Sequence, residues 1–266
     1  MNVLQTICAR RRKQVAVRRR AVPIEVLRSE HKPYHAPTRS LREAVGAPGL
    51  SIIAEHKRAS PSQGSYGISQ SPEQIASAYR DAGACAISVL TEPDDFGGSL
   101  EHLRAIRAVV DVPLLRKDFI VEPYQLHEAK AYGADAVLLI AAALSVSEAD
   151  ELRVAAHHIG LEVLLELHSE AELDYITIRP DVVGINNRDL TTLEIDVNTS
   201  VRLAKSLPSE LTKISESGLS SPDQLNLLAQ AGYDGFLMGT AFMKAKDPGR
   251  ALSLLFREFD QLSPAS

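Results

Sequence analysis

The chain has 266 residues, of which 45% are hydrophobic and 24% are charged, and its formal net charge at pH 7 is −5. This composition is typical of one folded domain with a large core and excludes a mainly disordered chain. No apolar run approaches the roughly 18 residues that cross a bilayer, and the acidic balance argues against nucleic acid as the principal partner. Two cysteines make no disulfide framework, which predicts a cytoplasmic protein.

The N-terminal segment differs from the rest of the chain in charge. Arginine and lysine cluster at 10–13 and 18–20, and no acidic residue precedes Glu25. A transit peptide would share this pattern but would also be rich in serine, and the first serine here is Ser29. A nucleic-acid-binding arm is a second alternative. We favour a basic amphipathic helix instead.

This helix would pack one apolar face, formed by Leu4, Ile7 and Val15, on the domain that follows. Residues 29–50, which contain three prolines, would then link the helix to the first strand. The segment is therefore predicted to be an extension of the main domain.

Eight short apolar runs recur along the remaining chain. Several are continuous rather than alternating, as expected of strands that are buried on both faces of a parallel sheet. The predicted strands cover residues 51–55, 84–90, 113–117, 136–140, 162–166, 182–186, 211–216 and 235–239. Helical spacing between them predicts helices at 71–82, 99–110, 122–132, 147–159, 221–231 and 247–259.

Local signals mark the ends of these helices. A serine cap followed by proline at the first helical position occurs at 71–72 and at 221–222. Glycines stand where a helix should end and a strand begin, at Gly83, Gly133, Gly160 and Gly232. The similar phrases GACAI, GADAV and GYDGF indicate a weak internal repeat of this junction.

Eight β–α units in one chain predict an α/β protein with a (β/α)8 TIM barrel. The alternative is an open doubly wound sheet, but no G-x-G-x-x-G follows the first strand. We place the catalytic barrel at 46–266 and the helical extension and linker at 1–45.

Polar side chains follow the predicted strands, where barrel enzymes carry their sites. Glu55 and Lys57 share one face of a strand, as do Asn186 and Arg188, because side chains alternate with period two. For Glu55 and Lys57, the alternative interpretation is an ordinary ion pair at the end of a strand. The predicted rim residues are Glu55, Lys57, Ser60, Lys117, Glu166, Asn186, Arg188, Glu216 and Ser217. Two lysines and three carboxylates on one rim favour acid–base chemistry.

The last two strands carry a second signal. Gly218 and Gly239 follow them in small-residue turns, with Thr240 next, and nearby amide groups could hold an anion. One glycine in a turn is weak support, but these are the loops that usually bind phosphate in this fold. We therefore predict a phosphate site here.

Six segments together resemble the indole-3-glycerol phosphate synthase family. They are IIAEHKRASPSQG, AISVLTEPDDFGGS, LLRKDFI, DAVLLIAAAL, GINNRDLTTLEID and ISESG, which run in order from the first strand to the last. The patterns E-x-K-x-x-S-P-S-x-G and K-D-F-I are specific to this family among phosphate-binding barrels. The departures are His56, where the family usually has an apolar residue, an unusual first loop, GSYGISQSPEQI, and the absence of acidic residues from the N-terminal segment.

The resemblance implies a carboxy-lyase of tryptophan biosynthesis that uses no metal or organic cofactor. Its substrate would be 1-(2-carboxyphenylamino)-1-deoxyribulose 5-phosphate, and its products indole-3-glycerol phosphate, carbon dioxide and water. Lys117 matches the family's general acid, and Glu55, Lys57 and Glu166 are candidates for the other proton transfers. Positioning is implied for Asn186, Glu216 and Ser217. The implied substrate-binding residues are Ser60, Phe96, Phe119, Leu138, Arg188, Gly218, Leu237, Gly239 and Thr240.

Other classes fit the residues less well. Phosphoribosylanthranilate isomerase would share the phosphate site but uses a cysteine and an aspartate, and neither Cys8 nor Cys85 is suitably placed. A non-catalytic phosphate-binding protein would not need the charged rim. A metal enzyme is disfavoured because His157, His158 and His168 fit no H-E-x-x-H spacing. The predicted partner is a phosphorylated small molecule, and other tryptophan-pathway enzymes are candidate protein partners.

Overall fold

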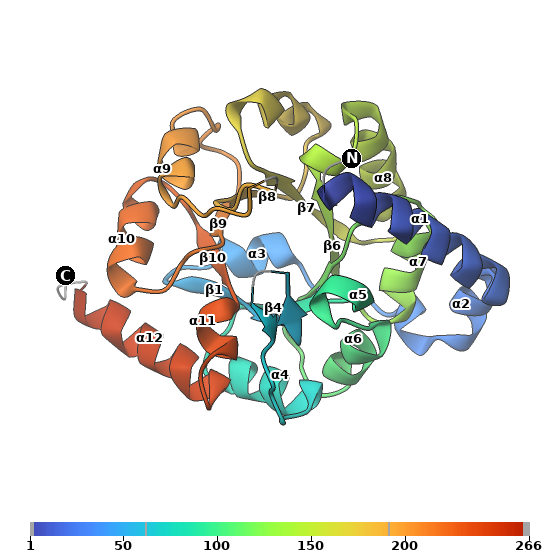
Figure 1. The fold of residues 1–266 in the computed structure, drawn as a ribbon, viewed down its shortest axis with the longest axis horizontal. Coiled ribbons are helices and arrows are strands. Elements are labelled where there is room, and N and C mark those ends of the chain that lie inside the picture. Colours follow the sequence, from blue (N-terminus) through green and yellow to red (C-terminus); the bar gives the residue numbers. More distant parts are fainter. Residues whose placement is uncertain (1–2, 62, 191, 263–266) are drawn as a thin grey trace.

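The computed structural model describes residues 3–61, 63–190 and 192–262, which form a closed parallel barrel surrounded by helices (Figure 1). Neighbouring strands follow chain order, and the first pairs with the last, Ser51 opposite Gly235. The barrel strands are β1 (Ser51–His56), β4 (Ala86–Leu90), β5 (Leu114–Lys117), β6 (Ala136–Ile140), β7 (Glu162–Leu167), β8 (Val182–Asn186), β9 (Lys213–Glu216) and β10 (Gly235–Met238). The predicted (β/α)8 barrel is confirmed.

Helices cover the outside of the barrel and one side of its mouth. The outer helices are α4 (Pro72–Asp81), α6 (Leu100–Arg107), α7 (Tyr124–Ala131), α8 (Val146–His158), α9 (Asn198–Ala204), α10 (Pro222–Gln230) and α12 (Pro248–Leu262). The loops hold β2 (Ala59–Ser60), β3 (Gly64–Ser65), α5 (Pro93–Phe96), η2 (Ala141–Ala143), η3 (Glu170–Ile178) and α11 (Thr240–Met243). Before the barrel come α1 (Val3–Ala21), α2 (Ile24–Glu30), η1 (Lys32–His35) and α3 (Leu41–Val45). No helix within the described ranges is both long and apolar enough to span a membrane.

The helix-end signals behave as predicted. Ser71 and Ser221 form capping boxes with a glutamine at the third helical position, and proline occupies the first. All four predicted stop glycines have positive φ, from 74° at Gly160 to 101° at Gly83. A side chain would be strained in that conformation, so glycine allows each helix to end and the next strand to begin.

Two elements between β7 and β9 were not predicted. The apolar side chains of η3 do not recur with the 3.6-residue period of an α-helix, because this segment is a 3₁₀ helix. Helix α9 has only 7 residues and no side-chain hydrogen bond at its N-cap. Cys85, predicted inside the second strand, lies just before β4 and is half-buried.

Helix α3 closes the amino end of the barrel. Leu41 and Val45 are fully buried and pack with Ile53, Ile214 and other inward-facing strand residues. A Cβ on Gly235, at the start of β10, would lie 3.1 Å from Val45 Cγ1. The floor of the barrel is therefore tightly packed, which leaves the carboxyl end for a site.

Helix α1, dark blue in Figure 1, packs on the barrel through both apolar and basic side chains. Leu4, Ile7 and Val15 are buried, as predicted. Arg11 is buried too, and its Nη2 lies 2.6 Å from Asp118 Oδ2. Arg18 makes a similar contact, 2.6 Å long, with Glu128 of α7. The acidic partners of this arginine-rich helix thus lie on the barrel instead of within the helix.

We expect Arg11→Met to lower the free energy of unfolding by about 1.5–3 kcal/mol, the usual contribution of a hydrogen bond to a charged group. The loss should be moderate because Arg116 still contacts Asp118, at 2.9 Å. Urea unfolding measures it. The matched control is Arg12→Met, since the neighbouring Arg12 is exposed and should contribute less than about 0.5 kcal/mol. Equal losses in the two variants would contradict the docking role of Arg11.

Candidate active site

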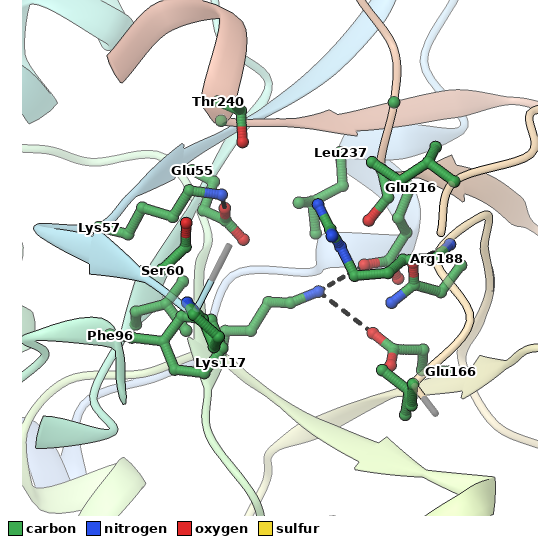
Figure 2. Close-up of a pocket in the computed structure, with 18 of the residues that line it drawn as sticks. Glu55, Lys57, Ser60, Phe96, Lys117, Glu166, Arg188, Glu216, Leu237 and Thr240 are labelled. Atoms are coloured by element: carbon green, nitrogen blue, oxygen red, sulfur yellow. Dashed lines mark hydrogen bonds and ion pairs between the residues drawn. The ribbon is translucent and has the colours of Figure 1, made fainter. Parts of the chain in front are cut away.

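A cavity of about 470 Å³ lies at the carboxyl ends of the strands (Figure 2). It is lined by all the residues that the sequence assigned to a site, namely Glu55, Lys57, Ser60, Phe96, Lys117, Phe119, Leu138, Glu166, Asn186, Arg188, Glu216, Ser217, Gly218, Leu237, Gly239 and Thr240. These residues come from all eight barrel strands or the loops that follow them. The structure brings them together, while their individual roles remain predictions.

Lys117 reaches from β5 into the middle of the cavity (Figure 2). Its Nζ lies 3.2 Å from Glu166 Oε2 and 2.5 Å from Glu216 Oε2. Burial alone would lower the pKa of Lys117, but Glu216, Glu166 and Glu55 outweigh burial and raise it above its ordinary value. The side chain is therefore a fully charged ammonium with a fixed direction.

The two carboxylates beside Lys117 have opposite pKa shifts. Burial raises the pKa of Glu216 to about 7, because the nearby charge of Glu166 offsets much of the attraction to Lys117. For Glu166, burial is outweighed by Lys117, His168 and Asn186, which hold its pKa well below the ordinary value. Near neutral pH the site thus contains one firmly ionised carboxylate and one that can carry a proton.

Two glycines make room for these acidic side chains. A Cβ on Gly184 of β8 would lie 2.3 Å from Glu216 Oε1, and one on Gly239 would lie 2.6 Å from Glu55 Oε1. A side chain at either position would therefore displace the facing carboxylate, although neither position has positive φ. Gly239 was predicted for its amide in a phosphate cradle, and the structure adds this steric requirement.

Glu55 and Lys57 form an ion pair across one wall of the cavity. Lys57 Nζ lies 2.5 Å from Glu55 Oε1, and Glu55 is 5% exposed. Burial raises the pKa of Glu55, but Lys57 and Lys117 together hold it below its ordinary value. The ordinary ion pair considered from sequence exists, and it faces the cavity.

His56 stands between these two residues in sequence and points the other way. It is fully buried, and its ring packs edge-on against His102 with centroids 5.4 Å apart. Burial, together with the charges of His102 and Arg58, lowers the pKa of His56 to about 3. The ring is therefore neutral and fills the outer core as an apolar residue would.

The loops after β9 and β10 form the predicted anion end of the cavity. Ser217 and Gly218 have consecutive positive φ values, 69° and 77°, and a serine in this region is strained. Thr240 opens the short helix α11, and Lys244, at the end of that helix, also lines the cavity. Lys244 was not predicted.

Tyr66 connects this end of the cavity to the loop after β1. Its hydroxyl lies 3.2 Å from Ser60 Oγ and 3.5 Å from Thr240 Oγ1. The unusual GSYGISQSPEQI segment therefore supplies a side chain that spans the two loops.

The opposite end of the cavity is apolar. The rings of Phe96 and Phe119 lie with centroids 6.3 Å apart, and Leu138 and Leu237 also line the cavity. Helix α1 adds Val3, Leu4 and Ile7, which the sequence analysis had assigned only to packing or not at all. A flat aromatic group would find apolar contacts here, and α1 would cover it.

Asn186 ends β8, and Arg188 follows two residues later. The Arg188 amide donates to Asn186 Oδ1 at 3.0 Å, and Arg188 Nη1 donates to the Leu193 carbonyl at 2.9 Å. Among the ion pairs of the described residues, none uses the Arg188 guanidinium. Its charge is available to an anionic ligand.

Two residues that shape the site were not predicted from the sequence, although one of them had a recognisable signal. His168 lies two residues after Glu166, the spacing that placed other pairs on one face, and its Nε2 is 3.1 Å from Glu166 Oε1. Gly184 gave no signal, because its role depends on a side chain of the neighbouring strand. In the described part of the chain, no group of three or more His, Cys, Asp or Glu side chains could hold a metal ion, and neither cysteine lines the cavity.

Comparisons with known proteins point to one family. Residues 4–255 match the model of the family described as indole-3-glycerol phosphate synthase. An indole-3-glycerol phosphate synthase of Bacteroides thetaiotaomicron is 47% identical over 251 residues, covering 94% of this chain and 96% of the relative. One of Salinibacter ruber is 46% identical over 262 residues, covering 97% and 96%.

Solved structures show the fold alone. A thiamine phosphate pyrophosphorylase from Pyrococcus furiosus matches with a TM-score of 0.61 and 17% identity, over 84% of this chain and 99% of that one. The KGPDC of Streptococcus mutans matches with a TM-score of 0.60 and 15% identity, over 80% and 98%. The fold is thus common to several enzymes, whereas the sequence matches and the residues around the cavity are more selective. The chain belongs to the indole-3-glycerol phosphate synthase family.

Proposed function

We propose that the chain closes the indole ring of 1-(2-carboxyphenylamino)-1-deoxyribulose 5-phosphate, with Lys117 as the general acid. The observation that carries this proposal is the ammonium of Lys117, held between the buried carboxylates of Glu166 and Glu216 in the cavity. An aromatic carbon must attack the substrate ketone, and the ketone oxygen needs a proton as the new bond forms. A fixed ammonium donates that proton and stabilises the developing charge.

The proton balance of the reaction requires further groups. The ketone oxygen finally leaves as water and so gains two protons, while the carbon beside the nitrogen loses one. Carbon dioxide leaves from the carboxylate without a proton, and its electron pair restores the aromatic ring. Each turnover therefore takes up one proton from solvent, and the site needs both proton donors and a base.

The opposite pKa shifts of the two carboxylates suggest how these tasks are divided. We assign Glu166, which is ionised, as the base. Glu216, whose pKa is raised to about 7, would return a proton to Lys117 after each donation. Glu55 and Lys57 would serve the dehydration from the other wall of the cavity. Asn186 and Ser217 would hold the substrate by hydrogen bonds.

The two ends of the cavity suit the two ends of the substrate. We propose that the phosphate binds the loops at Gly218, Gly239 and Thr240, which are the usual phosphate loops of this fold. Arg188 and Ser60 would face the substrate carboxylate. The aromatic ring would lie among the apolar residues Phe96, Phe119, Leu138 and Leu237. Family membership also supports a cytoplasmic location and other tryptophan-pathway enzymes as partners, and both remain proposals.

Lys117→Ala should lower kcat by about 10²–10⁴-fold, the range typical of a general acid, while the protein stays folded. The measurement is the rise of indole fluorescence from the carboxyphenylamino substrate. Lys205→Ala is the matched control because Lys205 is exposed at the end of α9, and its kcat should not change. A Lys117→Ala enzyme that keeps more than about a tenth of the wild-type kcat would remove Lys117 from the mechanism.

Thr240→Val should raise KM by about tenfold or more, the loss expected for one hydrogen bond to a charged group, with little change in kcat. Inorganic phosphate should inhibit the wild-type enzyme competitively, and the variant should need more phosphate for equal inhibition. Thr177→Val, at an exposed threonine of η3, is the control and should behave as the wild type. Purely uncompetitive inhibition would argue against the phosphate assignment.

A further inference from the structure

His168 lies directly behind the carboxylate that we assign as the base. Its Nε2 is 3.1 Å from Glu166 Oε1, whereas Lys117 approaches the other oxygen, Oε2. The His168 side chain is 11% exposed and is not among the residues that line the cavity. Glu166 is thus flanked by an ammonium at one carboxylate oxygen and by an imidazole at the other.

The 3₁₀ helix η3 fixes the imidazole in turn. Glu172 Oε2 accepts a hydrogen bond from the His168 amide at 2.6 Å and lies 3.5 Å from its Nδ1. The ring therefore has a carboxylate at each nitrogen. Because Glu172 comes from the segment that replaces the regular helix between β7 and β8, this contact depends on η3.

The charges in the cavity explain why a third cation matters. Three carboxylates, Glu55, Glu166 and Glu216, make ion pairs with only two ammonium groups, those of Lys57 and Lys117. Buried like charges oppose each other, so the carboxylate with the weakest support from cations binds a proton most readily. A cation next to Glu166 directs that proton to Glu216.

We propose that His168 is a positioning residue that keeps Glu166 ionised and aligned as the base of the reaction, and so decides which carboxylate beside Lys117 carries the proton. This inference rests on the proposed function. Burial would lower the pKa of His168, but Glu166 and Glu172 outweigh burial and raise it to about 10. The imidazolium is therefore charged throughout the neutral pH range.

Other charged groups around this pair are accounted for. Lys117, Glu216 and Glu55 face Glu166 from β5, β9 and β1. On the outer side, Arg202 of α9 borders the same surface hollow as His168, and it pairs with Asp196 at 2.9 Å. None of these groups replaces the contact at Glu166 Oε1.

The test is the pH profile of kcat/KM for the full-length His168→Gln enzyme, since glutamine can form a hydrogen bond but carries no charge. A base must be ionised to act, so activity falls as pH drops through its pKa. Without the cation the pKa of Glu166 rises, and the acid limb should move upward by about 1 pH unit or more. We expect kcat at pH 7 to fall about tenfold, because the ion pair beside the base is lost, and KM to stay within about twofold.

Two further variants make the result decisive. Glu172→Gln should move the acid limb in the same direction by a smaller amount. This variant also provides the test if His168→Gln fails to fold. His157→Gln is the matched control, because His157 forms a similar pair with Asp181, 2.7 Å long, outside the cavity, and its profile should equal that of the wild type. An unmoved acid limb in both His168→Gln and Glu172→Gln overturns the inference, even if kcat falls. A wild-type enzyme without ring-closure activity would instead overturn the proposed function.

Discussion

The pairing of the Lys117 ammonium with two buried carboxylates is the interaction on which the rest of the site depends. A charge of this kind is costly to desolvate unless anionic partners compensate, and here Glu166 and Glu216 do so at 3.2 and 2.5 Å. The same contacts divide the two carboxylates into an ionised and a protonable form. Stability of the buried charges and readiness for proton transfer therefore come from one arrangement.

The N-terminal helix is connected to this arrangement through the residue after Lys117. Asp118 accepts Arg11 from α1 and Arg116 from β5, and also the hydroxyl of Thr91 at 2.6 Å. The N-terminal part of α1, before Arg11, lines the cavity with Val3, Leu4 and Ile7. The covering helix and the catalytic strand thus share a buried anchor.

Much of this could be predicted from the sequence because the determinants are local. Strand runs, serine caps and stop glycines each act within a few residues, and barrel topology then carries the strand ends, such as Glu55 and Lys117, to one rim. The partners of Arg11 and His168 could not be predicted in the same way. Arg11 meets a residue 107 positions away, and His168 depends on a 3₁₀ helix whose apolar spacing has no clear period.

Gly184 shows how a neighbouring strand restricts sequence where no conformational demand exists. Its φ is ordinary, yet the space of its missing side chain is occupied by the Glu216 carboxylate. The position of that carboxylate thus depends on two residues, the glutamate itself on β9 and the glycine that faces it on β8. A chain with alanine at position 184 would keep every catalytic residue but would hold Glu216 in a different place. Building this site into another barrel therefore requires the glycine as well as the catalytic residues.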